Sequence, residues 1–137
     1  MNQDAIDAGL RTRSEVLGAT HVASSMKADD FSKPLEELVS EYCWNEIWNR
    51  PGLDRRTRSA INVAMLTALN RPQQLKLHIK GAINNGLSRQ EVQEILLQAA
   101  VYCGVPAGMD AFKAARDLFT EIDPTPAAPS AGSTGHA

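Results

Sequence analysis

The chain has 137 residues, of which 43% are hydrophobic, and it carries a formal net charge of −2. This length and apolar content suit one globular domain with a buried core, and the lack of a long basic run excludes the usual nucleic-acid binders. No apolar run is long enough to cross a membrane and the N-terminus lacks the apolar segment of a signal peptide, so we expect a cytoplasmic protein.

Apolar residues recur with a helical period through the middle of the chain, and no strand-like alternation occurs. Residues 1–12 carry no such pattern, and we expect a disordered N-terminal segment there. A first helix is predicted over 13–26, and a second begins at the N-cap Ser32 with Pro34 in its first turn. The predicted buried stripe of this second helix comprises Leu35, Leu38, Val39, Tyr42, Cys43 and Ile47.

Four further helices are predicted beyond the RPGLD break. Asp54 should cap the third, whose run SAINVAMLTALN is apolar on nearly every side, so we expect it to be the central and most buried helix. Pro72 opens the fourth helix and Gly86 ends it. The capping box SRQE at 88–91 opens the fifth, and the breaker GVP separates it from a sixth over 107–121.

The sequence therefore predicts an all-α fold, a compact bundle of about six helices over 13–122. The tail over 123–137 is rich in Pro, Ala, Ser and Gly, and we expect it to be disordered. Cys43 and Cys103 lie within apolar helical patterns, which favours two buried thiols over a disulfide.

Glu46 lies in the middle of the apolar arc of the second predicted helix. Burying an isolated carboxylate is costly, so Glu46 should form an ion pair with an arginine or serve as a catalytic acid. Trp44, Trp48 and Glu41 cluster on the opposite side, where Glu41 could also be a solvated charge. A helix that is apolar on two sides needs two packing partners, which indicates the core and either a second subunit or a pocket.

His78 lies on the apolar side of the fourth predicted helix, in the sequence LKLHIKGAINNG. It shares that face with Leu75, Ile79 and Ala82, of which Leu75 and Ala82 lie at offsets of three and four residues. Taken alone, this position favours a structural histidine in the core. Lys76 and Lys80 point elsewhere, and we expect them to be solvated.

Several arginines cluster in NRPGLDRRTRS, at the predicted start of the third helix. Backbone donors and guanidinium groups converge at such a helix N-terminus, which makes it a natural anion site. Arg50 and Arg58 are the candidates for binding, although a structural role is open for both, and Arg55 and Arg56 fit plain surface charge. A carboxylate, an imidazole and nearby guanidinium groups would suit proton transfer on a small anionic substrate.

Three stretches make the chain recognisable: RSEVLG, EYCWNEIWNRPGLDRRTRS and LHIKGAINNGLSRQEVQEILLQAAVYCGVP. They resemble the carboxymuconolactone decarboxylase family, and the likeness runs from about residue 12 to 121. The resemblance implies decarboxylation of 4-carboxymuconolactone to β-ketoadipate enol-lactone in protocatechuate catabolism. It also implies an all-helical fold and homo-oligomers, commonly hexamers with active sites near subunit contacts.

The wider superfamily includes AhpD-like peroxidases, whose signature is Cys-x-x-Cys followed by histidine four residues later. Laid on this chain, that histidine falls on His78, the cysteines fall on Arg71 and Gln74, and a relay glutamate falls near Ser59. Without a thiolate to attack a peroxide, peroxidase activity is disfavoured. No phosphate loop or metal-ligand spacing occurs either.

The resemblance implies a substrate that is its own electron sink, so no cofactor is expected. Arg50 and Arg58 would hold the carboxylate that stays, and Trp44 or Trp48 would supply an apolar wall beside the one that leaves. Cys103 would approach the pocket or simply be buried.

His78 would donate a hydrogen bond or a proton to the developing dienolate, and Glu46, with Glu41 as the alternative, would deliver the proton. Two other readings stay open. One is a helical oligomer that binds a small acid without catalysis, and the other is a decarboxylase or isomerase of a related lactone.

Overall fold

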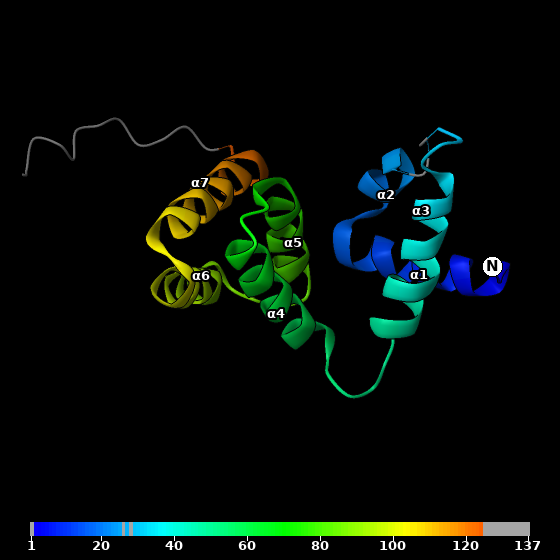
Figure 1. Cartoon of the computed structure of the whole chain (residues 1–137), viewed down its shortest axis with the longest axis horizontal. Helices are drawn as coiled ribbons and strands as arrows, with labels where there is room; N and C mark the ends of the chain where they lie inside the picture. Colours follow the sequence, from blue (N-terminus) through cyan, green and yellow to red (C-terminus); the bar gives the residue numbers. More distant parts are fainter. Residues whose placement is uncertain (1, 26, 28, 125–137) are drawn as a thin grey trace, which may run out of the picture.

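A computed structural model describes residues 2–25, 27 and 29–124. Within these residues the chain is all-helical, as predicted, with seven α-helices and one π-helix. In chain order the elements are α1 (Gln3–Leu17), α2 (Ala19–Ser25), α3 (Lys33–Leu38), the π-helix η1 (Val39–Ile47), α4 (Arg55–Ala68), α5 (Pro72–Asn84), α6 (Arg89–Cys103) and α7 (Val105–Ile122). Figure 1 shows two groups of helices, α1 to η1 and α4 to α7, joined by one loop.

Local signals in the sequence fix several helix ends, although Ser32, the predicted N-cap of the second helix, forms no side-chain capping hydrogen bond. The Asp54 side chain accepts a hydrogen bond from the Thr57 amide at 2.7 Å and so caps α4. Ser88 and Glu91 form the predicted capping box of α6. Gly104 has φ +121° between α6 and α7, a conformation that L side chains rarely adopt, so the GVP break falls where predicted.

The N-terminal prediction is wrong for most of its length. Residues 3–12 are helical because α1 begins at Gln3, where the Asn2 side chain accepts hydrogen bonds from the amides of Asp4 and Ala5. The helix predicted over 13–26 is divided at Gly18, whose φ of +99° separates α1 from α2. The predicted disordered tail lies outside the described residues from position 125 onward.

Two apolar clusters stabilise the two groups of helices. The larger joins α4 to α7 and includes Val63, Leu75, Ile79, Val92 and Leu96, all at most 1% exposed. The smaller joins α1 to η1 and comprises Val16, Leu17, Trp44 and Trp48. Leu77 of α5 packs against this second cluster, so α5 contacts both cores.

The predicted buried stripe of the second helix is wrong for four of its six residues, whereas Val39 and Cys43 are partly buried and pack against the smaller cluster. Leu35, Leu38, Tyr42 and Ile47 are 39–60% exposed, while Trp44 and Trp48 are at most 4% exposed. The reason is that α1 packs on the tryptophan side of η1. The helix also widens from α to π, with the Trp48 amide donating to the Cys43 carbonyl at 3.0 Å, which alters its period.

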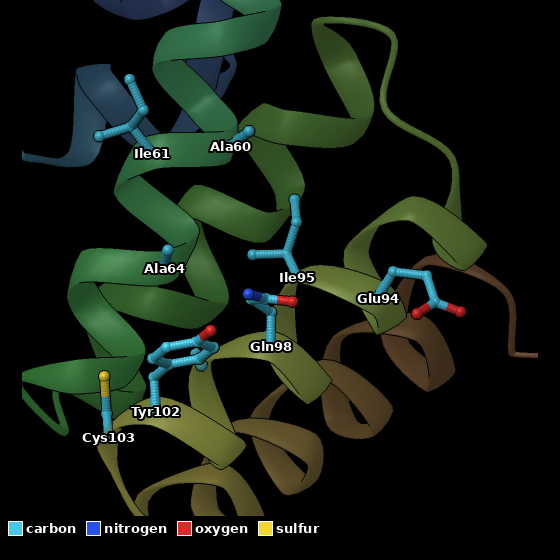
Figure 2. A pocket seen from close by; sticks show the side chains of 9 residues that line it. Ala60, Ile61, Ala64, Glu94, Ile95, Gln98, Tyr102 and Cys103 are labelled. Carbon is cyan, nitrogen blue, oxygen red and sulfur yellow. The ribbon is translucent and has the colours of Figure 1, made fainter.

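The expectation that the third predicted helix is the most buried is also wrong. Ile61 and Met65 of α4 and the following Leu69 are 40–63% exposed, so one side of α4 faces solvent while the rest packs on α5, α6 and α7. Ile61 on this side also lines an apolar groove against α6 (Figure 2). The central position belongs to α5, which buries Leu75, Ile79, Gly81 and Ala82.

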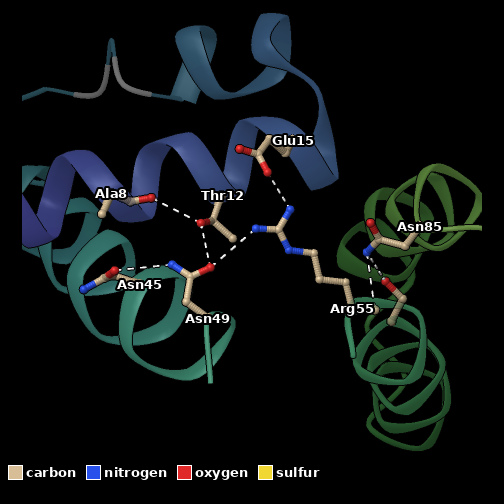
Figure 3. Close-up of polar contacts among 8 residues, drawn as sticks. Ala8, Thr12, Glu15, Asn45, Asn49, Arg55 and Asn85 are labelled. Atoms are coloured by element: carbon tan, nitrogen blue, oxygen red, sulfur yellow. Dashed lines mark hydrogen bonds and ion pairs between the residues drawn. The ribbon is translucent and has the colours of Figure 1, made fainter. Parts of the chain in front are cut away.

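Arg55 ties the two groups of helices together where the loop enters α4 (Figure 3). Its Nη1 lies 2.5 Å from Glu15 Oε2 of α1, and its Nη2 donates to Asn49 Oδ1 at 3.4 Å. The same amide oxygen accepts from Thr12 Oγ1 at 3.0 Å. Asn85, just beyond α5, donates to the Arg55 carbonyl at 3.4 Å. Side chains from both groups thus converge on one arginine, which we call the Arg55 clamp.

Gly9→Ala should destabilise the N-terminal group, because a Cβ at Gly9 would lie 1.7 Å from the Ser40 carbonyl oxygen of η1. We expect a loss of about 3 kcal/mol in the free energy of unfolding, measured by urea denaturation. Gly52→Ala is the matched control, since no heavy atom lies within 4 Å of a Cβ there. Equal stability of the two variants would contradict the close α1–η1 approach.

Candidate active site

His78 projects from α5 onto the tryptophans of η1. Its ring lies 6.1 Å from the Trp44 ring, centroid to centroid, with the planes 6° apart. Trp44 stacks in turn on Trp48 at 4.8 Å and 18°. The structure therefore brings together three of the residues singled out in the sequence at the seam, the contact region between the two groups of helices: His78 from α5, and Trp44 and Trp48 from the η1 side. Offset aromatic stacking of this kind contributes about 0.5–1.5 kcal/mol per pair beyond simple burial.

The His78 imidazole is held in its neutral form. Burial, followed by the positive charge of Arg13 and by His21, lowers the pKa of His78 from 6.5 to about 4. Its Nδ1 is buried and has no hydrogen-bond partner among the described residues. A neutral imidazole has one donor and one acceptor nitrogen, so this ring can both donate to and accept from a ligand.

Arg13 of α1 is the charged residue that sequence reasoning missed. It is buried, at 8% exposure, and its Nη1 forms an ion pair with Glu36 Oε2 at 2.8 Å, while Nη2 donates to Ser25 Oγ at 3.3 Å. Its Nε is buried without a partner in the described chain. A signal was present, because Arg13 continues the buried stripe of Gly9 and Val16 along α1.

A hollow of about 440 Å³, which we call the α5 hollow, opens between α2, α5 and α7. Its lining includes His21, Gln74, Lys76, Leu77, Lys80 and Glu121. His78 itself is not part of the lining. Gln74 precedes it by one helical turn on the same side of α5, and Leu77 is its neighbour in sequence. Both predictions of a solvated lysine need correction, since Lys76 and Lys80 are half-buried.

The arginines at the start of α4 are not brought to His78. Arg58 Nη2 donates to the Arg50 carbonyl at 3.2 Å, so these two candidates lie together. Arg58 Nε is buried without a partner, whereas Arg50 is exposed. In the described part of the chain neither forms a hydrogen bond or ion pair with His78 or the tryptophans. Arg56 is an exposed surface charge, as expected, and pairs with Glu91.

The two candidate glutamates lie apart from the imidazole. Glu46 is exposed, because the arc in which it lies is itself exposed in the single chain, so the predicted burial is wrong. Glu41 is half-buried, and its Oε1 accepts from the Asn2 amide at 3.5 Å, next to the start of α1.

The two cysteines are free, and they differ in exposure. Cys103 is exposed at the end of α6, where it lines the groove with Ala60 and Ala64 of α4 and with Tyr102 (Figure 2), and His78 is not among the residues that line this groove. The prediction of a buried Cys103 is therefore wrong. Cys43 is half-buried, and burial is the main cause of a raised thiol pKa there.

Among residues 2–25, 27 and 29–124 there is no cluster of three or more His, Cys, Asp or Glu side chains able to hold a metal ion. None of the helices in that part of the chain is long and apolar enough to span a membrane.

These features define an all-α protein with an imidazole and indole site at the seam between two groups of helices. The chain belongs to the carboxymuconolactone decarboxylase family, whose sequence model matches residues 33–117. The resemblance seen in the sequence is thereby confirmed.

Three curated relatives show how much of the chain this similarity covers. A 4-carboxymuconolactone decarboxylase from Acinetobacter baylyi is 38% identical over 119 residues, which cover 86% of this chain and 89% of the relative. A nitrosuccinic acid decarboxylase from Metarhizium robertsii is 38% identical over 112 residues, covering 81% and 78%. An uncharacterized 15.0 kDa protein from Paracoccus denitrificans is 30% identical over 86 residues, covering 61% and 63%.

The low pKa of His78 predicts a specific pH dependence of stability. Between pH 6.5 and about 4 the unfolded chain binds a proton at this imidazole and the folded chain does not. The free energy of unfolding should therefore fall as the pH falls through this window, by up to about 3 kcal/mol from this group. His78→Phe keeps a ring on Trp44 and should lose that part of the pH dependence in urea titrations. An NMR titration of His78 near pH 6.5 in the folded protein would contradict the prediction.

Proposed function

We propose that the protein is a cofactor-independent carboxy-lyase that converts 4-carboxymuconolactone to β-ketoadipate enol-lactone in protocatechuate catabolism. The observation that carries this proposal is a neutral imidazole stacked on the buried Trp44 indole, which stacks in turn on Trp48. The chain that holds it is 38% identical to a 4-carboxymuconolactone decarboxylase over 86% of its length. A catabolic role of this kind would place the enzyme in the cytoplasm.

The chemistry of the substrate explains why no cofactor is needed. One carboxylate of the lactone is attached to a ring carbon that is conjugated through the C=C bond to the lactone carbonyl. When the bond to this carboxylate breaks, CO₂ leaves and the electron pair passes through the alkene to the carbonyl oxygen, forming a dienolate. Protonation of the carbon next to the carbonyl then gives the enol-lactone. The protein must stabilise the dienolate oxygen and deliver that proton.

His78 is proposed to stabilise the dienolate oxygen by a hydrogen bond. With a pKa of about 4 it is neutral near pH 7, so it acts through an N–H hydrogen bond rather than as an imidazolium acid. The stacked Trp44 and Trp48 keep water from this ring, which strengthens the hydrogen bond and disfavours the leaving carboxylate.

Two roles remain, delivery of the proton and binding of the carboxylate that stays, and we propose that a neighbouring subunit completes the site for both. Glu46 is the proposed proton donor, with Glu41 as the alternative, and Arg50 with Arg58 is proposed to bind the carboxylate that stays. In the single chain Glu46 is exposed one helical turn after exposed Tyr42, so a second copy packed on this side would shield its carboxyl group from water. Cys103 would then line the same pocket only across a subunit contact. We therefore propose a homo-oligomer, a hexamer by resemblance to the family.

A second candidate substrate is nitrosuccinate, because the relative named for it is equally identical to this chain. It is also a dicarboxylic acid, and its nitro group would accept the electron pair in place of the lactone carbonyl.

Purified protein should release CO₂ from 4-carboxymuconolactone, and His78→Gln should lower kcat by about 10²–10⁴-fold, the usual contribution of one positioned donor or acid. Stopped-flow absorbance of the lactone and product analysis by NMR would measure this. Glu46→Gln and Glu41→Gln form a matched pair, of which only the true proton donor should lose a similar factor. Normal turnover by folded His78→Gln would refute the role of His78, and turnover of nitrosuccinate alone would favour the second candidate.

Leu38→Glu should weaken the proposed assembly, because it places a charge on the exposed apolar side of α3 and η1. Sedimentation velocity should give a multimer for the unaltered protein and smaller species for the variant. Gln90→Glu, at an exposed position of α6, is the control because it adds the same single negative charge elsewhere on the surface. A monomer at every concentration of the unaltered protein would exclude the assembly and, with it, the pocket role of Cys103.

A further inference from the structure

We infer that Lys80 and His21 form a carboxylate-binding subsite in the α5 hollow, which holds the carboxylate that a dicarboxylic substrate retains. This inference rests on the proposed function and deepens it. It revises one role in that proposal, because it assigns the retained carboxylate to a hollow on α5, the helix that carries His78, instead of to Arg50 and Arg58.

Lys80 has the geometry of a ligand-binding lysine rather than a solvated one. It is half-buried, and its Nζ lies over Gly18, 3.5 Å from where a Cβ on that residue would be. Within the described residues it has no ion-pair partner. A half-buried ammonium group without a carboxylate partner is poorly compensated, so an anion from outside the chain would complete it.

Lys76, a second lysine that lines the hollow, differs from Lys80 because it has a carboxylate partner. It also lines the hollow, but it pairs with Glu121 of α7 at the rim. Since Glu121 compensates Lys76, the unbalanced charge of the lining belongs to Lys80.

His21 connects Lys80 to the imidazole of the proposed reaction. It is half-buried, and its imidazole interacts electrostatically with the charges of Arg13 on α1, Lys80 on α5 and Glu36 on α3. Burial is the main cause of the lowered pKa of His21, and the positive charges of Arg13 and Lys80 lower it further. The negative charge of Glu36 raises it in part. His21 in turn contributes to the low pKa of His78. The two histidines therefore interact electrostatically, and His21 lines the same hollow as Lys80, so a ligand bound at Lys80 would lie beside His21.

The hollow also offers neutral donors and room. Gln74 lines it one turn before His78, and Leu77 provides an apolar floor that continues into the cluster of Trp44 and Trp48. The volume of about 440 Å³ is within the range of small-molecule sites. A substrate with a carboxylate on Lys80 could thus extend its apolar ring toward the tryptophans.

Lys80→Met tests the subsite in steady-state kinetics with 4-carboxymuconolactone. Loss of one charge-assisted contact should raise KM by about 10–100-fold while kcat changes less than about 3-fold, and Lys80→Arg should recover most of the loss. Lys113→Met, an exposed lysine of α7 paired with Asp117, is the matched control. An unchanged KM in Lys80→Met, or a raised KM in Arg50→Met instead, would overturn the inference.

A binding measurement separates this subsite from the proposed reaction. Saturating succinate, an unreactive dicarboxylate, should raise the NMR-detected pKa of His21, because a bound anion favours the protonated imidazole. Equal concentrations of propionate should raise it less, and the rise should vanish in Lys80→Met. If the lactone is not turned over and succinate still acts, the proposed function fails and the subsite stands. If the lactone is turned over and succinate leaves His21 unchanged, the subsite fails alone.

Discussion

The stacking of His78 on Trp44 is the contact on which the rest of the structure depends. It joins a ring from α5, whose other side packs into the larger core, to η1, which belongs to the smaller one. The hydrogen bond from Asn84 Nδ2 to the Val16 carbonyl, at 2.7 Å, fixes α5 against α1 two turns further along. Because both helix groups are needed to form the seam, the candidate site exists only when the whole chain is folded.

Charge in this seam is arranged to keep the imidazole neutral. A buried guanidinium group would be costly alone, but Arg13 is compensated by Glu36 and by Ser25. The remaining positive field falls on His78 and His21, and it adds to the effect of their burial. An anionic substrate would enter a region that already favours negative charge, so binding and the protonation states of the histidines should be linked.

The sequence predicted the local features better than the packing. Caps and breaks such as Asp54, Ser88 and Gly104 depend on nearby backbone groups, and they were confirmed. The buried face of η1 depends on which helix covers it, and nothing within its own sequence shows that α1 packs on the tryptophan side. His78 and the tryptophans could be named as candidates from their residue types and positions. The burial of Arg13 and the exposure of Glu46 depend on how the helices pack, so neither was foreseen. The catalytic and binding roles of these residues stay predictions.

The Arg55 clamp has a consequence for how the molecule responds to its medium. Glu15 and Arg55 are both partly exposed, so dissolved ions compete for this pair, whereas the stacked rings are shielded from them. Rising ionic strength should therefore loosen the connection between the helix groups at its edge before it disturbs the centre. The two helix groups would then move more freely relative to each other at high salt, while the stacked rings of His78, Trp44 and Trp48 keep them in contact.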